Sequence, residues 1–385
     1  MFLIVLLLNI NFKRQIMKRY FILLVVLSLN QISFSQSEIK SIENTLLDYI
    51  EGTSYNHPDQ IQKAFYTDAN LYLDSKDNGM RVVPISQYIS WFKKGEQGEF
   101  TGRVGNILSI DYFGNVAYAK AEVLIPESSL RYVDLFILKK VNNQWKIISK
   151  TANSETSNLK GDRILFIVSN AHFYGDSNLA TGNSYSEIIN AYDTFVKAGY
   201  TVDFVSPEGG SIPLAYINTS DELSKSYLYN PDFMYALKHT KKPAEINPKN
   251  YKAVHYIGGG SAMFGVPENT AIQNIVMTIY EDHRGIISSV CHGTAGIVHL
   301  KTKSGKYLVE GKRVNGYPDA YERKDAEHFK QFPFLITQTI EERGGDFNYS
   351  PRNTVHVEVD GNLVTGQNYL SSKPVALKII EMLKK

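Results

Sequence analysis

The only cysteine of the chain, Cys291, lies between an apolar run and a small-residue turn. The run reads Gly285-Ile-Ile-Ser-Ser-Val290, and His292 and Gly293 follow the cysteine. This pattern predicts a strand, a tight turn and a helix, with the thiol held at the turn as in a nucleophile elbow. Unpaired amides and the dipole at a helix start favour an anion, so we expect this thiol to ionise more readily than a free one.

The counts of residue types narrow the chemistry further. One cysteine excludes intramolecular disulfides and Cys-rich metal sites, so the thiol is either a small buried hydrophobe or a reagent. The imidazole of the adjacent His292 favours the interpretation that this thiol is a reagent. Six further histidines show no short metal-ligand spacing, so we expect no metal; they are His172, His239, His255, His283, His299 and His328.

The charge balance argues against a nucleic-acid partner. The 41 basic and 39 acidic side chains leave a formal charge of +2, and the aromatic residues are spread along the chain rather than interleaved with basic clusters. The turn Gly258-Gly-Gly260 lacks the lysine and the helix context of a phosphate loop. We therefore expect no nucleotide and no other cofactor.

Alternating strands and helices must position the thiol. The predicted strands are 164–169, 201–205, 253–257 and 285–290, and the predicted helices are 186–198 and 269–283. Strands that alternate with helices in this way imply a parallel sheet with helices on both faces.

Four ordered motifs over about 225 residues resemble the DJ-1/PfpI superfamily, in its Hsp31-like, class I glutamine amidotransferase-like branch. They are Thr181-Gly-Asn-Ser-Tyr-Ser-Glu187, Ala198-Gly-Tyr-Thr-Val-Asp-Phe-Val-Ser-Pro-Glu-Gly-Gly210, Cys291-His-Gly293 and Gly316-Tyr-Pro-Asp-Ala-Tyr-Glu322. The resemblance implies an α/β flavodoxin-like, doubly wound parallel-sheet domain over residues 161–385.

The resemblance also implies a catalytic set. Glu187 would sit beside the thiol of Cys291 and exchange a proton with it or with its adduct. His292 would be the partner imidazole, and Glu322, which looks exposed in the sequence, would orient that imidazole. A carboxyl group in an apolar cleft can hold a proton near neutral pH, which suits the first role.

Oxyanion stabilisation would come from backbone amides near Gly259 or Gly260 and at the turn that contains His292 and Gly293. The chain departs from its relatives here, because several of them carry a histidine where Gly260 stands. We expect that change to alter the pocket without removing a backbone donor.

A second pair competes for the catalytic role. His356 and Glu358 lie on a strand-like run, and alternation places both side chains on one face. Class I glutamine amidotransferases use a late His-x-Glu pair with their cysteine. The following segment, 360–368, resembles instead the last strand of Hsp31-like domains, so we interpret His356 as structural.

The stretch 37–151 reads as helices followed by a curved antiparallel sheet. Apolar residues at helical spacing run from Ile39 to Ile50, a short helix covers 58–65, and strand-like alternation follows at 70–73, 101–112, 116–125, 132–139 and 145–150. Three motifs in it resemble the NTF2-like superfamily, in particular its SnoaL-like and lumazine-binding-like members: Tyr49-Ile-Glu-Gly52, the run that ends at Ala69, and Trp145-Lys-Ile-Ile-Ser-Lys150. This implies an α+β cone domain.

Such a cone encloses a pocket, and five polar or aromatic residues are candidates to line it: His57, Asp68, Asp74, Trp91 and Asp134. For each of them a surface or core position with a local partner is the favoured interpretation, because a fold does not determine a function. We assign no chemistry to this domain. A polar linker, 152–160, separates it from the second domain.

The first 35 residues read as an export signal. Lys18 and Arg19 precede an apolar run, 20–29, and Ser33-Phe-Ser35 offers small residues for cleavage. Met17 begins a complete signal by itself and is our preferred start. The run is short for a permanent membrane span, although an uncleaved anchor stays an alternative. We expect a periplasmic or secreted protein.

The resemblance to Hsp31-like proteins implies a glutathione-independent glyoxalase of the glyoxalase III type, a lyase that converts methylglyoxal, a small 2-oxoaldehyde, to D-lactate. Two alternatives stay open. One is a stress chaperone that holds clients on an apolar patch around 227–237, and the other is a cysteine amidohydrolase or peptidase of the same fold. A homodimer is also open.

Overall fold

The computed structural model describes residues 38–75, 77, 79–92 and 95–384. The expected export signal therefore lies outside the described residues. The chain divides into two compact units: the first contains the described residues up to Val123 together with Tyr132–Ser154, and the second contains Leu124–Arg131 and the chain from Glu155 onward.

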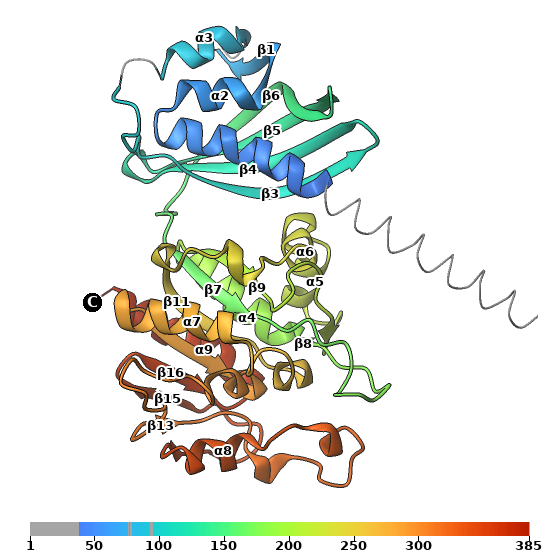
Figure 1. Cartoon of the computed structure of the whole chain (residues 1–385), viewed down its shortest axis with the longest axis vertical. Helices are drawn as coiled ribbons and strands as arrows, with labels where there is room; N and C mark the ends of the chain where they lie inside the picture. Colours follow the sequence, from blue (N-terminus) through green and yellow to red (C-terminus); the bar gives the residue numbers. More distant parts are fainter. Residues whose placement is uncertain (1–37, 76, 78, 93–94, 385) are drawn as a thin grey trace, which may run out of the picture. The chain divides into compact units, whose positions relative to one another are not determined.

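In the first unit, helices cover one face of a six-stranded sheet (Figure 1). The strand order is β2-β1-β6-β5-β4-β3, with β1 antiparallel to β2 and parallel to β6. The helices are 38–54, α2 (Pro58–Ala64) and α3 (Ile85–Ser90). The strands are β1 (Phe65–Asp74), β2 (Met80–Pro84), β3 (Val104–Phe113), β4 (Val116–Ile125), β5 (Leu130–Val141) and β6 (Gln144–Thr156).

Period-two alternation builds the core of this unit. Along β4, Ala117, Ala119 and Ala121 are buried, and Ile42 and Leu46 of the first helix are buried as well. The α+β cone expected from the sequence is confirmed, but its sheet is not wholly antiparallel as expected, because β1 runs parallel to β6. Two elements, β2 and α3, were not expected, because five or six residues are too few to show a reliable hydrophobic period.

The second unit is built on a six-stranded sheet with the order β15-β16-β12-β11-β7-β9. All neighbouring strands are parallel except the edge pair β15 and β16. The strands of this sheet are β7 (Arg163–Ile167), β9 (Thr201–Val205), β11 (Tyr251–Tyr256), β12 (Ile286–Val290), β15 (Val357–Asp360) and β16 (Leu363–Gly366). Two short pairs lie outside it: β8 (Asn183–Ser184) with β10 (Leu214–Ala215), and β13 (Arg313–Val314) with β14 (Asp346–Phe347).

Helices pack on both faces of this sheet (Figure 1). Along β7, Leu165 and Ile167 join one buried apolar cluster, whereas Ile164 and Phe166 join the other. The first cluster includes residues of α7 (Thr270–Met277) and α8 (Ile336–Glu342), and the second includes residues of α4 (Tyr185–Lys197), α6 (Pro231–Lys238) and α9 (Ser372–Leu383). The expected doubly wound α/β fold is confirmed, with one antiparallel edge strand.

The carboxyl ends of the central strands meet at one edge of the sheet. Tyr256 of β11 pairs with Ser289 of β12, and Val290 pairs with Gly366 of β16. The chain therefore leaves β12 at Cys291 and leaves β11 toward Gly258 next to each other. Ligands of open α/β sheets bind beyond this edge.

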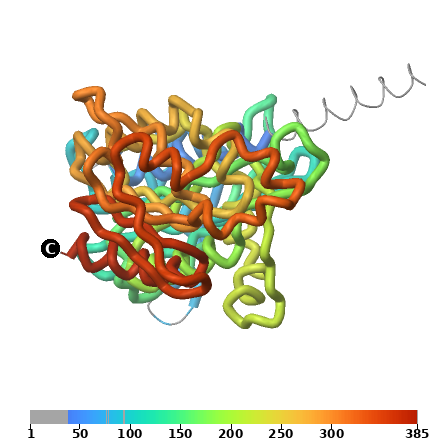
Figure 2. Tube along the Cα trace, turned by 90° about the horizontal axis from the view of Figure 1, so that it is seen from below, coloured from blue at the N-terminus to red at the C-terminus, as the bar shows by residue number. Residues whose placement is uncertain are grey.

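The segment 227–237 does not form the apolar patch that the sequence suggested. It lies in a lobe made by α5 (Glu222–Leu228) and α6, which projects from the rest of the domain (Figure 2). Phe233 and Leu237 are buried in the second cluster, and only Tyr229 is largely exposed, at 74%. Helical spacing places the large apolar side chains of α6 on the face that packs inward.

Candidate active site

Cys291 sits on a sharp turn directly after β12. Its φ of 56° lies in the left-handed region, which is rare and strained for a residue with a side chain. At Gly293 an added Cβ would meet the backbone of Tyr256 and Ile257, so only glycine lets the turn pack this closely. The nucleophile elbow is present, but Cys291–Ile297 is a 3-10 helix rather than the expected α-helix.

A hydrogen-bonded chain runs from the thiol through an imidazole to a carboxylate. The distance from Cys291 Sγ to His292 Nδ1 is 3.5 Å, and the distance from His292 Nε2 to Glu322 Oε1 is 2.8 Å. The Glu322 side chain is only 8% exposed, so the exposed position expected from its sequence neighbours was wrong. The structure brings together the three residues that the resemblance had paired.

Aromatic rings fix the orientation of this imidazole. The ring of His292 stacks on that of Tyr317 at 4.6 Å and 20°, and its edge meets Phe332 at 5.8 Å. The backbone N–H of Tyr317 also donates to the carbonyl of Cys291 at 3.1 Å. An ionised Glu322 keeps the proton of a neutral imidazole on Nε2, which leaves Nδ1 as an acceptor that faces the sulfur.

Glu187 reaches the thiol from the other side. It lies in the first turn of α4 and is 2% exposed. Its Oε2 accepts a hydrogen bond from the N–H of Gly258 at 2.8 Å, and its carboxyl group also hydrogen-bonds with the thiol of Cys291. Burial raises the pKa of Glu187 to about 7, although these hydrogen bonds act in the opposite direction. This carboxyl group can hold or release a proton near neutral pH.

The expectation that the thiol ionises easily was wrong for this structure. Burial, and then the negative charge of Glu187, raise the pKa of Cys291 well above its usual value, while the backbone N–H of His292 acts weakly in the other direction. A seven-residue 3-10 turn offers less help to an anion than an α-helix start does. The resting thiol is therefore neutral, and it must lose its proton to a neighbouring base when it reacts.

Three consecutive glycines form the floor of the site. An added Cβ at Gly258 would lie 2.6 Å from Glu187 Oε2 and 2.9 Å from Cys291 Cβ. Gly259 has a φ of 97°, and an added Cβ there would meet the backbone of residues 182–184. At Gly260 it would overlap the phenol of Tyr174. No side chain larger than that of glycine fits along this floor, and the N–H of Gly258 is already bonded to Glu187.

Short strands and one amide side chain place the helix that carries Glu187. Asn183 of β8 exchanges two hydrogen bonds of 2.8 Å with the backbone of Ser169, at the end of β7. The neighbouring Ser184 donates its N–H to the carbonyl of Gly258 at 2.9 Å. These contacts join the first turn of α4 to the glycine floor.

Sequence reasoning missed several residues of this site. Asn183 and Tyr317 both lie inside motifs that were noticed, so their sequence neighbours were the available signal. Tyr174 and Phe332 lie in irregular segments without periodicity, and no sequence signal marked them.

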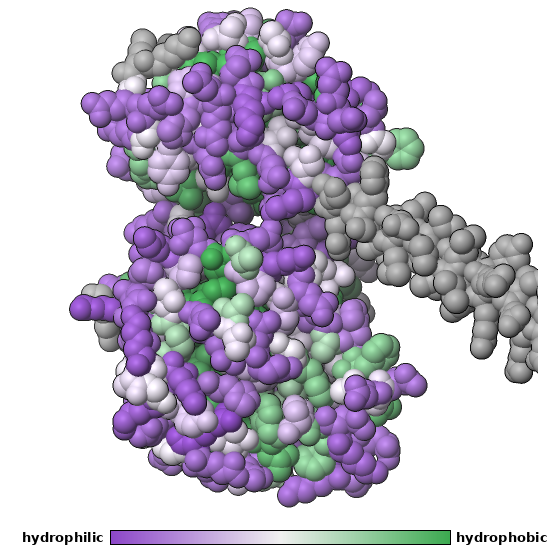
Figure 3. Space-filling model, viewed as in Figure 1, coloured by the Kyte–Doolittle hydropathy of each residue, from purple (hydrophilic) through white to green (hydrophobic). Residues whose placement is uncertain are grey.

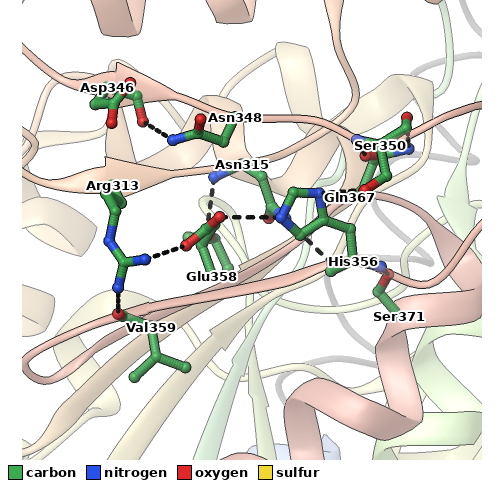
Figure 4. Close-up of polar contacts among 11 residues, drawn as sticks. Arg313, Asn315, Asp346, Asn348, Ser350, His356, Glu358, Val359, Gln367 and Ser371 are labelled. Carbon is green, nitrogen blue, oxygen red and sulfur yellow. Dashed lines mark hydrogen bonds and ion pairs between the residues drawn. The ribbon is translucent and has the colours of Figure 1, made fainter.

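The competing pair forms a separate cluster (Figure 4). His356 Nε2 lies 3.0 Å from Glu358 Oε1, and its Nδ1 lies 3.0 Å from Ser350 Oγ. Arg313 pairs with the same carboxylate at 3.4 Å. Both ring nitrogens of His356 thus have hydrogen-bond partners within this cluster. Glu358 lies on the edge strand, and Ser350 lies in the loop before it. The geometry favours a structural role for His356 and Glu358.

Only one of the five pocket candidates of the first unit lies in its interior. Asp134 is buried, accepts a hydrogen bond from Tyr49 at 2.7 Å and pairs with Lys150 at 2.8 Å. Asp68, Asp74 and Trp91 are exposed, and His57 is partly exposed at the start of α2. The interior group is a compensated ion pair, and no chemistry is assigned to it.

None of the helices in the described part of the chain is long and apolar enough to cross a membrane. On the face drawn in Figure 3, apolar side chains lie in several separate groups between polar ones.

Comparisons with known proteins match both halves of the chain. The family model described as "Putative lumazine-binding" matches residues 37–152, and the DJ-1/PfpI family model matches residues 178–382. The glutathione-independent glyoxalase hsp3102 of Schizosaccharomyces pombe is 31% identical over 234 residues, which cover 56% of this chain and 95% of that protein. Glyoxalase 3 of Candida albicans is 28% identical and covers 55% and 93%.

Solved structures agree with these matches. The rapid encystment protein of Francisella tularensis is 26% identical with a TM-score of 0.55, and it covers 58% of this chain and 99% of its own. The crystal structure of glyoxalase III from Candida albicans is 25% identical with a TM-score of 0.51, and it covers 57% and 97%. The lumazine-binding-like match identifies an NTF2-like domain in the first part of the chain. The DJ-1/PfpI match spans more than half of the 385 residues, and the chain belongs to the DJ-1/PfpI family.

Proposed function

We propose that the second domain is a glutathione-independent glyoxalase of the glyoxalase III type, which converts methylglyoxal and water to D-lactate. The observation that carries the proposal is the contact of one thiol, that of Cys291, with two bases, Glu187 and the Glu322-oriented His292. The curated relatives named above are glyoxalases, and the chain spans more than nine-tenths of their length. The stereochemistry of the product is inherited from the family resemblance.

The first step adds the thiol to the aldehyde carbon of the substrate. The carboxylate of Glu187 accepts the S–H proton while the new bond between sulfur and C1 forms, because a neutral thiol is a weak nucleophile. The aldehyde oxygen takes up negative charge, which the amides of Gly259 and Gly260 stabilise. Glu187 then returns its proton to that oxygen, and a hemithioacetal results.

The second step moves a hydrogen from C1 to C2. His292 Nδ1 removes the C1 proton, and the electron pair forms a C1–C2 double bond while charge moves to the ketone oxygen. The imidazolium, stabilised by Glu322, returns the proton to C2, while the proton of the C1 hydroxyl passes through Glu187 to the C2 oxygen, so that C1 becomes a thioester carbonyl and C2 carries the hydroxyl group. Water then cleaves the bond between sulfur and C1, which releases the hydroxyacid and restores the thiol. No oxidant or reductant is needed.

The test is lactate formation from methylglyoxal without glutathione, measured with a D-lactate-specific assay. We expect Cys291→Ala to abolish turnover and His292→Asn to lower it by about 10²-fold or more. His356→Asn is the matched control, because it removes an imidazole from the neighbouring cluster, and it should retain nearly full turnover. Since Cys291 is the only cysteine, thiol titration verifies the first variant without ambiguity. Undiminished lactate formation by Cys291→Ala would end the proposal.

Amide or peptide hydrolysis is the alternative for the same elbow, because it also passes through an acyl group on the sulfur. A rapid burst with an activated acyl ester, without lactate formation from methylglyoxal, would favour it. The chaperone alternative loses its main support, because Phe233 and Leu237 of the segment 227–237 are buried and, of its large apolar side chains, only Tyr229 is largely exposed.

We also propose that the protein is exported. The support is the sequence of residues 18–35 alone. Expression of the full chain, followed by N-terminal sequencing of the mature protein, tests it: a new N-terminus near residue 36 is expected, and an intact N-terminus in the cytoplasm would contradict the proposal.

A further inference from the structure

A short hairpin holds Tyr174 above the glycine floor. The N–H of Tyr174 donates to the carbonyl of Leu179 at 3.0 Å, and the N–H of Thr181 donates to the carbonyl of His172 at 2.8 Å. Thr181 also opens the segment that leads to Glu187. The hairpin is therefore connected directly to the element that carries a proposed catalytic carboxyl group.

The phenol of Tyr174 fills the space above Gly260. An added Cβ at Gly260 would overlap the phenol oxygen and would lie 2.6 Å from Thr181 Oγ1. The tyrosine ring also contacts Phe332, with centroids 6.1 Å apart, and Phe332 contacts the ring of His292 at 5.8 Å. Tyr174 is thus linked through Phe332 to the imidazole that lies beside the thiol.

The glycine floor connects the surroundings of Cys291 with those of Tyr174. Gly258 touches Glu187 and Cys291, whereas Gly260, two residues further, touches Tyr174. Two residues of extended chain span at most about 7 Å. A three-carbon 2-oxoaldehyde attached to the sulfur at C1 would extend along the same floor toward the phenol.

A second tyrosine supports the first. Tyr216 follows β10 directly, and β10 pairs with β8 beside the start of α4. The phenols of Tyr216 and Tyr174 hydrogen-bond, and Tyr216 is close enough to Cys291 and Glu187 to be influenced by their charges. Its φ of 59° is strained for a bulky residue, and it is 66% exposed. Strain of this kind persists only where the surroundings hold a side chain in place, and it often marks ligand sites.

We propose that Tyr174, oriented by Tyr216, donates a hydrogen bond to the ketone oxygen at C2 of the bound 2-oxoaldehyde and so selects vicinal dicarbonyl substrates. This inference rests on the proposed glyoxalase function. Negative charge develops on that oxygen when the C1 proton leaves, and a fixed donor lowers the energy of that state. The phenol keeps its own proton throughout, so the steps given above stay balanced.

The first test compares Tyr174→Phe with the wild type. We expect kcat/KM for methylglyoxal to fall by about 10²-fold, the typical effect of removing one donor from an oxyanion. Tyr216→Phe should cost about 10-fold, because it only orients the donor. Tyr229→Phe, which removes a phenol oxygen from an exposed residue of the α5–α6 lobe, is the matched control. The rate of Cys291 alkylation by iodoacetamide should stay within about twofold in all three variants, since none of them removes a group that holds the thiol proton.

The second test needs no turnover. Pyruvate carries two adjacent oxygen-bearing carbons, and we expect it to protect Cys291 of the wild type from iodoacetamide at least tenfold better than it protects Tyr174→Phe. Loss of protection in the variant together with absence of lactate formation in the wild type would retain the contact of Tyr174 with a bound 2-oxo compound and overturn the proposed glyoxalase function.

The remaining outcomes count against the inference. If the wild type forms lactate and Tyr174→Phe keeps kcat/KM within twofold, Tyr174 does not contact the substrate and the glyoxalase function stands alone. If pyruvate protects the wild type and Tyr174→Phe equally well, the inference fails as well. If the wild type shows neither lactate formation nor protection, both proposals are overturned.

Discussion

Two buried carboxyl groups of the same α/β domain have opposite proton affinities. Glu187, at the start of α4, has a pKa raised to about 7, whereas the pKa of Asp203, in β9, is lowered. Burial acts on both to raise the pKa. At Asp203 it is outweighed by Lys241 at 3.0 Å and Arg163 at 2.8 Å. In the described structure no lysine or arginine pairs with Glu187; the thiol of Cys291, the amide of Gly258 and the imidazole of His292 lower its pKa by less than burial raises it.

The difference separates a structural from a reactive site. Asp203 also accepts a hydrogen bond from Tyr251 at 2.9 Å, so both cations and this phenol stabilise its negative charge. The carboxyl group is therefore ionised at any ordinary pH. Both the protonated and the ionised form of Glu187 are populated near neutral pH, which is the condition for general acid–base catalysis. Burial alone therefore does not identify a catalytic carboxyl group; the absence of a compensating cation does.

Among the substitutions of carboxyl groups, the largest effect is expected from Glu187→Gln. The amide cannot accept the thiol proton, so kcat/KM for methylglyoxal should fall by about 10³-fold. In the wild type kcat/KM should rise with pH through about 7, where the carboxyl group ionises; the residual activity of the variant should lack this rise. A full pH–rate profile of both proteins is the measurement. A variant that keeps wild-type activity and the same rise would remove Glu187 from the reaction.

Asp203→Asn should change stability instead of rate. The substitution removes the carboxylate that pairs with the largely buried Arg163 and the more exposed Lys241, and we expect the free energy of unfolding to fall by about 3 kcal/mol. Urea denaturation followed by circular dichroism measures this loss. Turnover per folded molecule should equal that of the wild type, and a selective loss of turnover would break the distinction between the two carboxyl groups.

As pH rises, Glu187 should lower the free energy of unfolding, whereas Asp203 should raise it. The raised pKa of Glu187 means that the folded state binds a proton more tightly than the unfolded state, so its contribution is present below pH 4.5 and is lost as pH rises toward 7. The full change for one group amounts to about 3 kcal/mol. The lowered pKa of Asp203 contributes stability above pH 3.8, and this is lost as pH falls further.

Urea titrations at several pH values, with each single variant beside the wild type, check these signs. Glu187→Gln should remove only the loss between pH 4.5 and 7, whereas Asp203→Asn should remove only the loss below pH 3.8. Identical curves for the variant and the wild type would contradict the assigned pKa direction of that group.

Glu322→Gln should give the smallest effect. The amide can still accept a hydrogen bond from His292, but it cannot stabilise the imidazolium, so we expect about a 10-fold loss of kcat/KM. Stability should change little, because Glu322 has one hydrogen-bonded partner rather than a buried group of cations. Steady-state kinetics and urea denaturation are the measurements, and they compare this variant with Glu187→Gln for rate and with Asp203→Asn for stability. A loss of stability as large as that of Asp203→Asn would class Glu322 as structural.

The sequence predicted much of this domain correctly. Five-residue apolar strands such as β9 and β12 are recognisable because both faces of a parallel sheet are buried. The sequence neighbours of Cys291 identified the elbow, since Gly293 is needed for the close turn. In the first unit the short elements β2 and α3 were missed, because so few residues cannot show a hydrophobic period.

The sequence by itself determined the main alternating strands and helices of the second domain, the elbow, and the pairing of His292 with Cys291, because each depends on residues that are close along the chain. The proton affinities of Cys291 and Glu187 were decided only by the tertiary structure. They depend on which charges and dipoles the fold brings within a few ångströms and on how far water is excluded. The same is true of Tyr174, whose phenol lies over Gly260 although 86 residues separate them in the chain.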